Sequence, residues 1–272
     1  MTAENGSAPL WPHATRPSVG VPVITPENAF FLKARRTAQE YFFKGLFSEP
    51  KATMNDGRVE LAAVRQHLRP GSVIVDVGAH VGVFSRRFAA LAPDCTVVAF
   101  EPQSLPRAVF SMVGFFRNKR NILVMPLALG ADAGLIELSI PIKRKGAVGI
   151  GLAHVGDDAD LKDRFDVRKE LVAIARLDDV LARMDLGPVS LIKIDVEGGE
   201  LGVLRGATQT LETHGPAVLC EIDGREHRFG DQSDALGAFL QALGYAPFSL
   251  ETGAALPMDG LEKNTLFLKG ST

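Results

Sequence analysis

The sequence predicts a doubly wound α/β domain whose sheet is mostly parallel and closes in an antiparallel hairpin. Three apolar runs favour this fold: residues 72–77 before a glycine loop and a helical pattern at 81–91, residues 96–101 before a helical pattern at 104–117, and residues 190–196 between helical patterns at 177–184 and 200–211. Buried-type strands that alternate with helices are typical of a parallel sheet covered on both faces.

The remaining elements follow in chain order. Amphipathic patterns at 27–47 and 59–68 predict two helices before the first strand. Further strands are expected at 122–128, 135–140, 171–175 and 217–222, followed by a helix at 234–243 and closely spaced strands around 246–250 and 265–268. The last two strands fit the closing hairpin.

We expect two regions in the chain. Residues 1–57 form an N-terminal arm and helical extension, and residues 58–272 form the main domain with an insertion at about 141–170. The aromatic-rich helix at 27–47 either packs on the main domain or serves as a lid or a homodimer contact. The insertion is glycine-rich and then densely charged, so we interpret it as a mobile segment that contributes to substrate selection.

Composition fits an enzyme with a full hydrophobic core. The chain has 272 residues, 46% of them hydrophobic, and a formal net charge of −2, which gives no electrostatic reason to expect nucleic acid or an anionic membrane as a partner. No apolar run approaches the roughly 20 residues of a membrane span, and the N-terminus lacks a secretion-signal pattern. Cys95 and Cys220 are predicted to be reduced and packed, as in a cytoplasmic protein.

The loop after the first strand indicates the kind of cofactor. Asp76 ends the strand, Gly78 and Gly82 follow, and His80 stands where a dinucleotide fingerprint has its second glycine. A carboxylate here would repel a diphosphate but suits the amino group and sulfonium of S-adenosylmethionine. We therefore favour S-adenosylmethionine over NAD, with Asp76 toward the methionine part and Gly78, Ala79, His80 and Gly82 along the cofactor.

The second strand ends in Glu101 and Pro102, 25 residues after Asp76. An acid at this position in nucleoside-binding α/β domains accepts hydrogen bonds from the two ribose hydroxyls. Glu101 is therefore predicted to bind the ribose, and Leu127, Ala128 and Leu129 are predicted to lie near the adenine.

A third site segment begins at Lys193 and continues through Asp195, Glu197 and Glu200. Closely spaced carboxylates raise one another's pKa and are candidates for substrate binding, general-base catalysis or metal binding. Glu200 could instead favour the start of the next helix electrostatically. Lys193 is expected to pair with a neighbouring acid such as Glu221 in a structural role.

These motifs resemble the FkbM family of S-adenosylmethionine-dependent methyltransferases. The resemblance rests on VDVGAHVGVFS, AFEPQ, NILVMPLALG, ARLDDVL, IKIDVEGGELGVLRGA and CEIDG, which cover roughly residues 58–225. It implies a class I, Rossmann-like methyltransferase fold and methyl transfer to a hydroxyl oxygen of a sugar or polyketide-type natural product. One departure is that the family pattern E-P-x-P is not kept, because Pro106 comes later than expected.

The chemistry would require a base near the methyl group. Asp195, Glu197 and His227 are the candidate catalytic residues, and Glu221 and Asp223 also follow strands that end at this edge. A divalent metal on Asp195, Glu197 and Asp223 is a minority alternative that we do not favour. An NAD-dependent oxidoreductase and a non-catalytic binding domain remain the rival functions.

Overall fold

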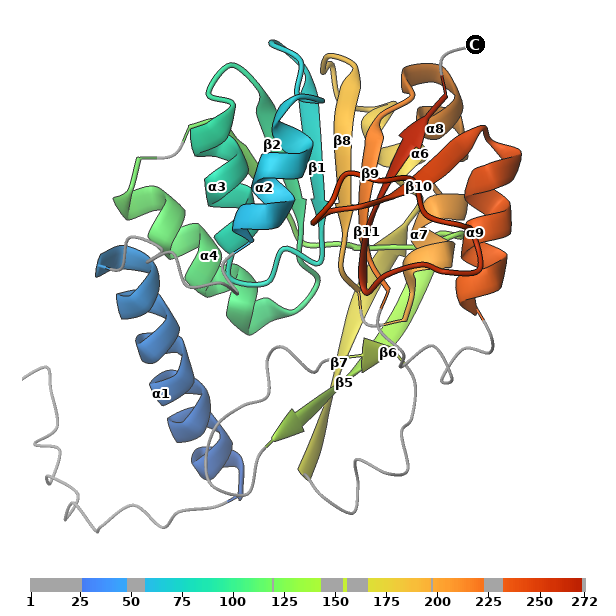
Figure 1. Ribbon diagram of the computed structural model, residues 1–272. Helices are drawn as coiled ribbons and strands as arrows, with labels where there is room; N and C mark the ends of the chain where they lie inside the picture. The colour runs from blue at the N-terminus through green and yellow to red at the C-terminus, as the bar shows by residue number, and fades with distance from the viewer. Residues whose placement is uncertain are drawn as a thin grey trace, which may run out of the picture.

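The central sheet has the predicted mixed topology. The computed structural model describes residues 26–47, 57–118, 120–142, 154–155, 166–196, 198–222 and 232–270. Within these residues, seven strands form a sheet in the order β10-β11-β9-β8-β1-β2-β3 (Figure 1). The strands are β1 (Val73–Val77), β2 (Thr96–Phe100), β3 (Ile122–Met125), β8 (Val189–Ile194), β9 (Ala217–Glu221), β10 (Tyr245–Ser249) and β11 (Asn264–Lys269).

Five of these strands run parallel, and the last two form the closing hairpin. Strand β1 pairs in parallel with β2 and with β8, whereas β11 lies antiparallel to both β9 and β10. The carboxyl ends of the parallel strands therefore meet along one edge, where open α/β sheets bind ligands. The fold class predicted from the sequence is confirmed.

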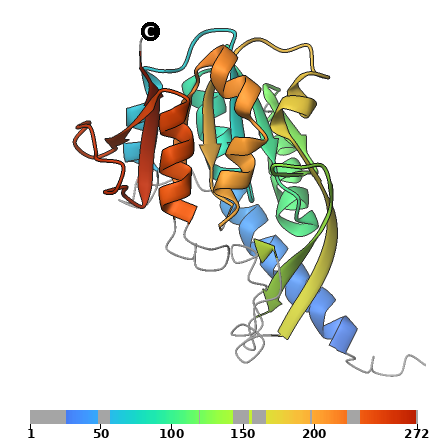
Figure 2. The ribbon, with the colours of Figure 1, turned by 90° about the vertical axis from the view of Figure 1, so that its right-hand side faces the viewer.

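Helices cover both faces of the sheet (Figure 2). They are α2 (Arg58–Arg65), α3 (Val83–Leu91), α4 (Ser104–Phe116), α6 (Leu177–Leu181), α7 (Glu200–Arg205), α8 (Thr208–His214) and α9 (Gln232–Ala242). Successive side chains of a strand point to opposite faces. Ile74 accordingly packs in a core with residues of α2 and α3, while Val73 and Val75 pack with residues of α7, α8 and α9.

A second sheet projects from the carboxyl edge. It contains β4 (Ala128–Leu129), β5 (Gly134–Ile142), β6 (His154–Val155) and β7 (Asp166–Ala175) in the order β4-β7-β5-β6. Strands β5 and β7 pair from Gly134 opposite Ile174 to Ile142 opposite Asp166, and form the long arm in Figure 2.

This second sheet corrects two expectations. The strand predicted at 122–128 ends at Met125, because Ala128 pairs with β7 instead of continuing beside β2. The insertion expected as a mobile segment begins and ends in paired strands, since residues 141–142 belong to β5 and residues 166–170 belong to β7. Its glycines at 146, 149, 151 and 156 lie outside the described residues.

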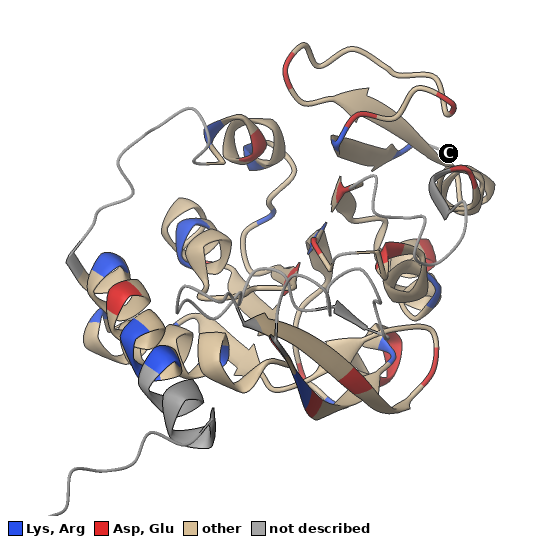
Figure 3. Cartoon of the chain, turned by 90° about the horizontal axis from the view of Figure 1, so that it is seen from below, with Lys and Arg blue, Asp and Glu red and all other residues tan. Residues whose placement is uncertain are grey.

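The aromatic helix α1 (Pro26–Phe47) packs against α4. Phe42 contacts Phe116 edge to face, and Ala34 belongs to a small core with Val113 of α4. The predicted packing on the main domain is thus present. Lysine and arginine residues lie along the helix (Figure 3), and Lys44 is exposed near its end.

The helix predicted at 200–211 is two helices, α7 and α8. Gly206 ends α7, and a side chain at this position would collide with the carbonyl oxygen of Gly130. The carboxylate of Asp178 accepts hydrogen bonds from the backbone N–H groups of Gln209 and Thr210, and so caps α8. The break is decided by this tertiary contact.

Three further expectations concern the cysteines, membrane-spanning helices and the N-terminal arm. Cys95 and Cys220 are buried and are not joined in a disulfide, as predicted. Among the described helices, none is both long and apolar enough to cross a membrane. The predicted N-terminal arm before residue 26 lies outside the described residues.

Candidate cofactor and active site

Several of the predicted site residues meet at the carboxyl edge of the sheet. Asp76 lies in β1, Glu101 directly follows β2, and Asp195 directly follows β8. Because β1 lies between β2 and β8, the three carboxylates come from neighbouring strands. His80 lies in the loop after β1, and the ring of Tyr41 from α1 meets the His80 ring edge-on, with centroids 5.6 Å apart.

Glu101 is held firmly at this edge. Its side chain is buried, and its carboxylate accepts hydrogen bonds from the backbone N–H of His80 and of Gln103, each 2.8 Å long. Burial raises the pKa of Glu101 to about 7, against the lowering effect of those two hydrogen bonds. Each carboxylate oxygen can accept more than one hydrogen bond, so acceptor capacity remains for a ribose diol.

Arg107 holds the backbone that follows Glu101 in place. Its guanidinium donates to the carbonyl oxygens of Glu101, at 3.1 Å, and of Pro102, at 2.5 Å. Pro106 is buried in the first turn of α4, where its missing N–H is tolerated. The departure from the family's E-P-x-P pattern is therefore accommodated by the helix start.

The glycines of the cofactor loop serve close packing within the protein. Gly78 has φ of 76°, and a Cβ there would lie 1.9 Å from the carbonyl oxygen of Asp195. Gly82 has φ of 75°, and a Cβ there would meet the ring of Phe110 at 2.2 Å. Close packing against Asp195 and α4 thus requires glycine at both positions, and their place along the cofactor stays a prediction.

His80 adopts the left-handed conformation, with φ of 53°. Burial lowers its pKa to about 4, while Asp195 raises that pKa and Lys193 lowers it further, so the imidazole is neutral at pH 7. Its Nε2 atom is buried and has no hydrogen-bond partner among the described residues. A buried polar atom without a partner is the kind of group that a bound ligand satisfies.

Asp76, Lys193 and Asp195 form a connected group of charges. The ammonium of Lys193 lies 3.1 Å from Oδ2 of Asp195 and 3.5 Å from Oδ1 of Asp76. The hydroxyl of Ser85 donates to Oδ2 of Asp76 at 2.5 Å. The expected pairing of Lys193 with a neighbouring acid is confirmed, but its partners are Asp76 and Asp195, whereas Glu221 acts on it only through a longer-range field.

The other predicted contacts are placed less directly. Leu129 packs in the main core, so among the three residues predicted near the adenine Leu127 and Ala128 keep more exposed surface. Glu197 and His227, predicted as catalytic, lie outside the described residues, as does Asp223.

The residues at this edge fit S-adenosylmethionine. Buried Glu101 has acceptor capacity for two hydroxyls, His80 offers a free ring nitrogen, and Asp195 supplies a partly exposed carboxylate for a cationic group. Within the described residues, no group of three or more His, Cys, Asp or Glu side chains could hold a metal ion.

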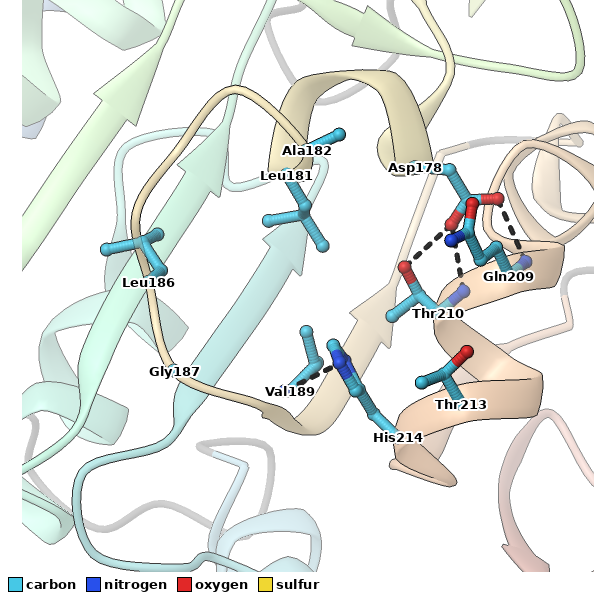
Figure 4. Close-up of a pocket in the computed structure, with 10 residues that line it drawn as sticks. All are labelled: Asp178, Leu181, Ala182, Leu186, Gly187, Val189, Gln209, Thr210, Thr213 and His214. Atoms are coloured by element: carbon cyan, nitrogen blue, oxygen red, sulfur yellow. Dashed lines mark hydrogen bonds between the residues drawn. The ribbon is translucent and has the colours of Figure 1, made fainter.

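A separate hollow of about 170 Å³ lies at the opposite edge of the sheet (Figure 4). It is bordered by α6, α8 and the start of β8. His214 accepts a hydrogen bond from the backbone N–H of Val189, and Asp178 caps α8 there. Asp178, Thr210 and His214 thus serve local structure, and among the described residues none of those predicted for the site lines this hollow (Figure 4).

Sequence reasoning missed Ser85, Tyr41 and the double pairing of Lys193. A lysine inside a buried strand was the available signal for a charge group, but its partners depend on strand order. Ser85 and Tyr41 had no distinguishing pattern, because their contacts with Asp76 and His80 arise only when α3 and α1 are packed in place.

The sheet order and the acids at its carboxyl edge define a class I methyltransferase fold. The family model described as "Methyltransferase FkbM domain" matches residues 76–247. The chain belongs to the FkbM methyltransferase family.

The curated relatives differ in size and in name. The chain is 25% identical over 232 residues to "AMB antimetabolite synthetase AmbE" of Pseudomonas aeruginosa, with 76% of the chain and 10% of that protein covered. It is 32% identical over 184 residues to "31-O-demethyl-FK506 methyltransferase FkbM" of Streptomyces tacrolimicus, with 60% of the chain and 70% of that protein covered. The chain therefore spans about a tenth of the first relative and most of the second.

A solved structure of methyltransferase FkbM from Methylobacillus flagellatus KT superposes with a TM-score of 0.49 and 18% sequence identity. The match covers 88% of this chain and 58% of that one.

Proposed function

We propose that the protein transfers a methyl group from S-adenosylmethionine to a hydroxyl oxygen of a small molecule, such as a sugar or a polyketide-type natural product. The observation that carries this proposal is the meeting of Glu101, His80 and Asp195 at one sheet edge, within a chain of the FkbM family. Membership in the family supports methyl transfer, and the site supports the choice of cofactor.

Bound S-adenosylmethionine supplies an electrophilic methyl group whose leaving group is a neutral thioether. The protein therefore has mainly to align the acceptor oxygen with the methyl group. In this proposal Glu101 accepts the ribose hydroxyls, and the neutral imidazole of His80 makes a hydrogen bond to the cofactor or the acceptor.

An unactivated hydroxyl gains from a base that removes its proton, by about 10² to 10⁴ in rate. We assign this role to Asp195, because it is a carboxylate at the carboxyl edge of the sheet with 35% of its side chain exposed. Glu197 and His227 remain candidates by sequence alone.

The nature of the acceptor is supported by the surroundings of the edge and by one relative. Helix α1 and strand β5 both reach the loop after β1, because Ala34 and Ile140 pack in one cluster with Val81. These elements would enclose an acceptor of limited size. The relative from Streptomyces tacrolimicus is named for methylation of 31-O-demethyl-FK506, which favours an oxygen acceptor.

The test begins with calorimetric titration of the protein with S-adenosylmethionine, S-adenosylhomocysteine and NAD. Binding of the first two and not of NAD is expected, followed by methylated product in a mass-spectrometric screen of sugar and polyketide hydroxyls. Binding of NAD alone would favour the oxidoreductase. Cofactor binding without turnover on any acceptor would favour the non-catalytic binding domain.

A further inference from the structure

Lys193 occupies an unusual place for a charged residue. It lies inside β8, a strand buried along its whole length, and only 7% of its side chain is exposed. Burial of an ammonium is costly unless ionised partners lie close to it. A lysine retained here therefore needs a strong electrostatic reason.

The strand register supplies that reason. Lys193 pairs with Asp76 across the parallel β1–β8 ladder, so the two side chains are neighbours on one face. Asp195 follows Lys193 by two residues at the end of the same strand. One ammonium thus lies between a carboxylate with no exposed surface and a carboxylate that is 35% exposed.

The groups around the Asp76–Lys193–Asp195 cluster keep Lys193 in its charged form. Asp76 receives the hydroxyl of Ser85 from α3, and its carboxylate also feels the field of Glu101 from β2. The fields of Glu221 from β9 and of Asp195 reach Lys193, and neutral His80 lies near both residues of the Lys193–Asp195 pair. Burial acts to lower the pKa of Lys193, but Asp76 and Asp195 outweigh it and raise that pKa, so the lysine stays charged.

We propose that Lys193 is a positioning residue that neutralises Asp76 and fixes Asp195, so that the Asp76–Lys193–Asp195 cluster presents one net negative charge to the cofactor rather than two. This role rests on the proposed function, because it concerns a cofactor that carries a sulfonium cation. A cluster with a net charge of −1 attracts that cation, and it still releases the demethylated product, whose sulfur is neutral.

The net charge of the cluster can be measured through an affinity ratio, defined as the affinity for S-adenosylmethionine divided by the affinity for S-adenosylhomocysteine. The two molecules share the adenosine and amino-acid parts, so a change in the site's net charge acts on their difference, the sulfonium. One additional negative charge at a distance of about 10 Å is expected to change the ratio by about tenfold at an effective dielectric constant of about 20. A loss of packing alone would weaken both ligands equally and leave the ratio unchanged.

The experiment is calorimetric titration of both ligands at pH 9, where the carboxylates are most fully ionised, with each variant compared with the wild-type protein at the same pH. Lys193→Gln makes the cluster more negative and should raise the ratio about tenfold. Asp195→Asn makes the cluster less negative and should lower the ratio about tenfold. The double variant restores the net charge and should return near the wild-type ratio.

Two further variants serve as controls. Lys193→Arg keeps the charge and should keep the wild-type ratio. Lys263→Gln removes a lysine that pairs with Glu221 at 3.0 Å but is 65% exposed, so it should leave the ratio unchanged.

The inference is overturned if folded Lys193→Gln keeps the ratio within twofold of wild type, or if Lys193→Arg shifts it as Lys193→Gln does. Should Lys193→Gln not fold, Asp195→Asn decides alone, and an unchanged ratio refutes the role. Failure of the wild-type protein to bind either ligand would instead refute the proposed function and this role with it.

Discussion

Glu101→Gln is the change that most directly tests the cofactor site. The side chain is 6% exposed and accepts two backbone hydrogen bonds of 2.8 Å, so it is already fixed in place before a ligand binds. A hydrogen bond to a charged group contributes about 1.5–3 kcal/mol. Two ribose hydroxyls on this carboxylate would contribute about 3 kcal/mol at the lower value, which is a loss of about a hundredfold in affinity.

The variant is expected to fold normally. The amide oxygen can accept from one of the two backbone N–H groups, but the amide NH2 cannot accept from the other, since His80 and Gln103 donate to different oxygens of Glu101. The substitution also removes a buried charge. Because the folded pKa of about 7 lies above the ordinary value of 4.5, the ionised carboxylate lowers stability as pH rises between these values. At pH 8 the removed charge offsets part of the cost of the lost backbone hydrogen bond, so Glu101→Gln should remain folded.

The assay is calorimetric titration with S-adenosylhomocysteine at pH 8, with thermal unfolding as a check of the fold. Glu212→Gln is the matched control, since Glu212 is exposed on α8, away from the carboxyl edge. If Glu101→Gln binds within twofold of the wild-type affinity, the assignment of the ribose to Glu101 is wrong.

The remaining predictions concern pH, packing, catalysis and assembly. Wild-type affinity for S-adenosylhomocysteine should fall as pH drops through about 7, because protonated Glu101 cannot accept from both hydroxyls; titrations from pH 5.5 to 8.5 that show no such fall would contradict this. Gly78→Ala should lower the free energy of unfolding by several kcal/mol more than Gly71→Ala in urea melts, because both glycines have positive φ but only Gly78 faces a backbone oxygen; equal losses would refute the steric argument. Asp195→Asn should lower kcat by about 10² or more with the acceptor found in the screen, and an unchanged kcat would exclude Asp195 as the base. We also propose that the exposed aromatic side chains of α1 and α4 pair with a second copy of the chain, so Phe115→Asp, at a residue 81% exposed, should convert a dimer to a monomer in light scattering, and a wild-type monomer would contradict it.

The order of elements was predictable because each main strand carries its own local signal. The runs that became β1, β2 and β8 are apolar and bounded by glycine or acidic residues, and Asp76 and Glu101 directly mark the strand ends. The predicted ends of strands and helices were wrong where residues outside the segment determine them. Ala128 pairs with β7 rather than continuing β3, and Asp178 caps α8 through residues 31 and 32 positions further along the chain.

The roles of individual site residues were predictable to different degrees. Glu101 could be placed because the end of the second strand is a fixed point in this class of sheet. Lys193 could not be paired correctly, since the sequence does not show that β8 lies beside β1 in the register that sets Lys193 opposite Asp76. The same holds for Tyr41, which reaches His80 only through the packing of α1 on α4.

The sequence by itself determined the doubly wound sheet, the edge at which its acids gather and the family, because strand ends, glycine turns and apolar periodicity are local properties of the chain. Only the tertiary structure decided that Asp76 is buried and paired with Lys193, that Gly78 and Gly82 face protein atoms, and that the insertion starts and ends in a β arm. Those outcomes depend on which strands become neighbours and on how close they come, and such long-range contacts are set by the packing of the whole domain.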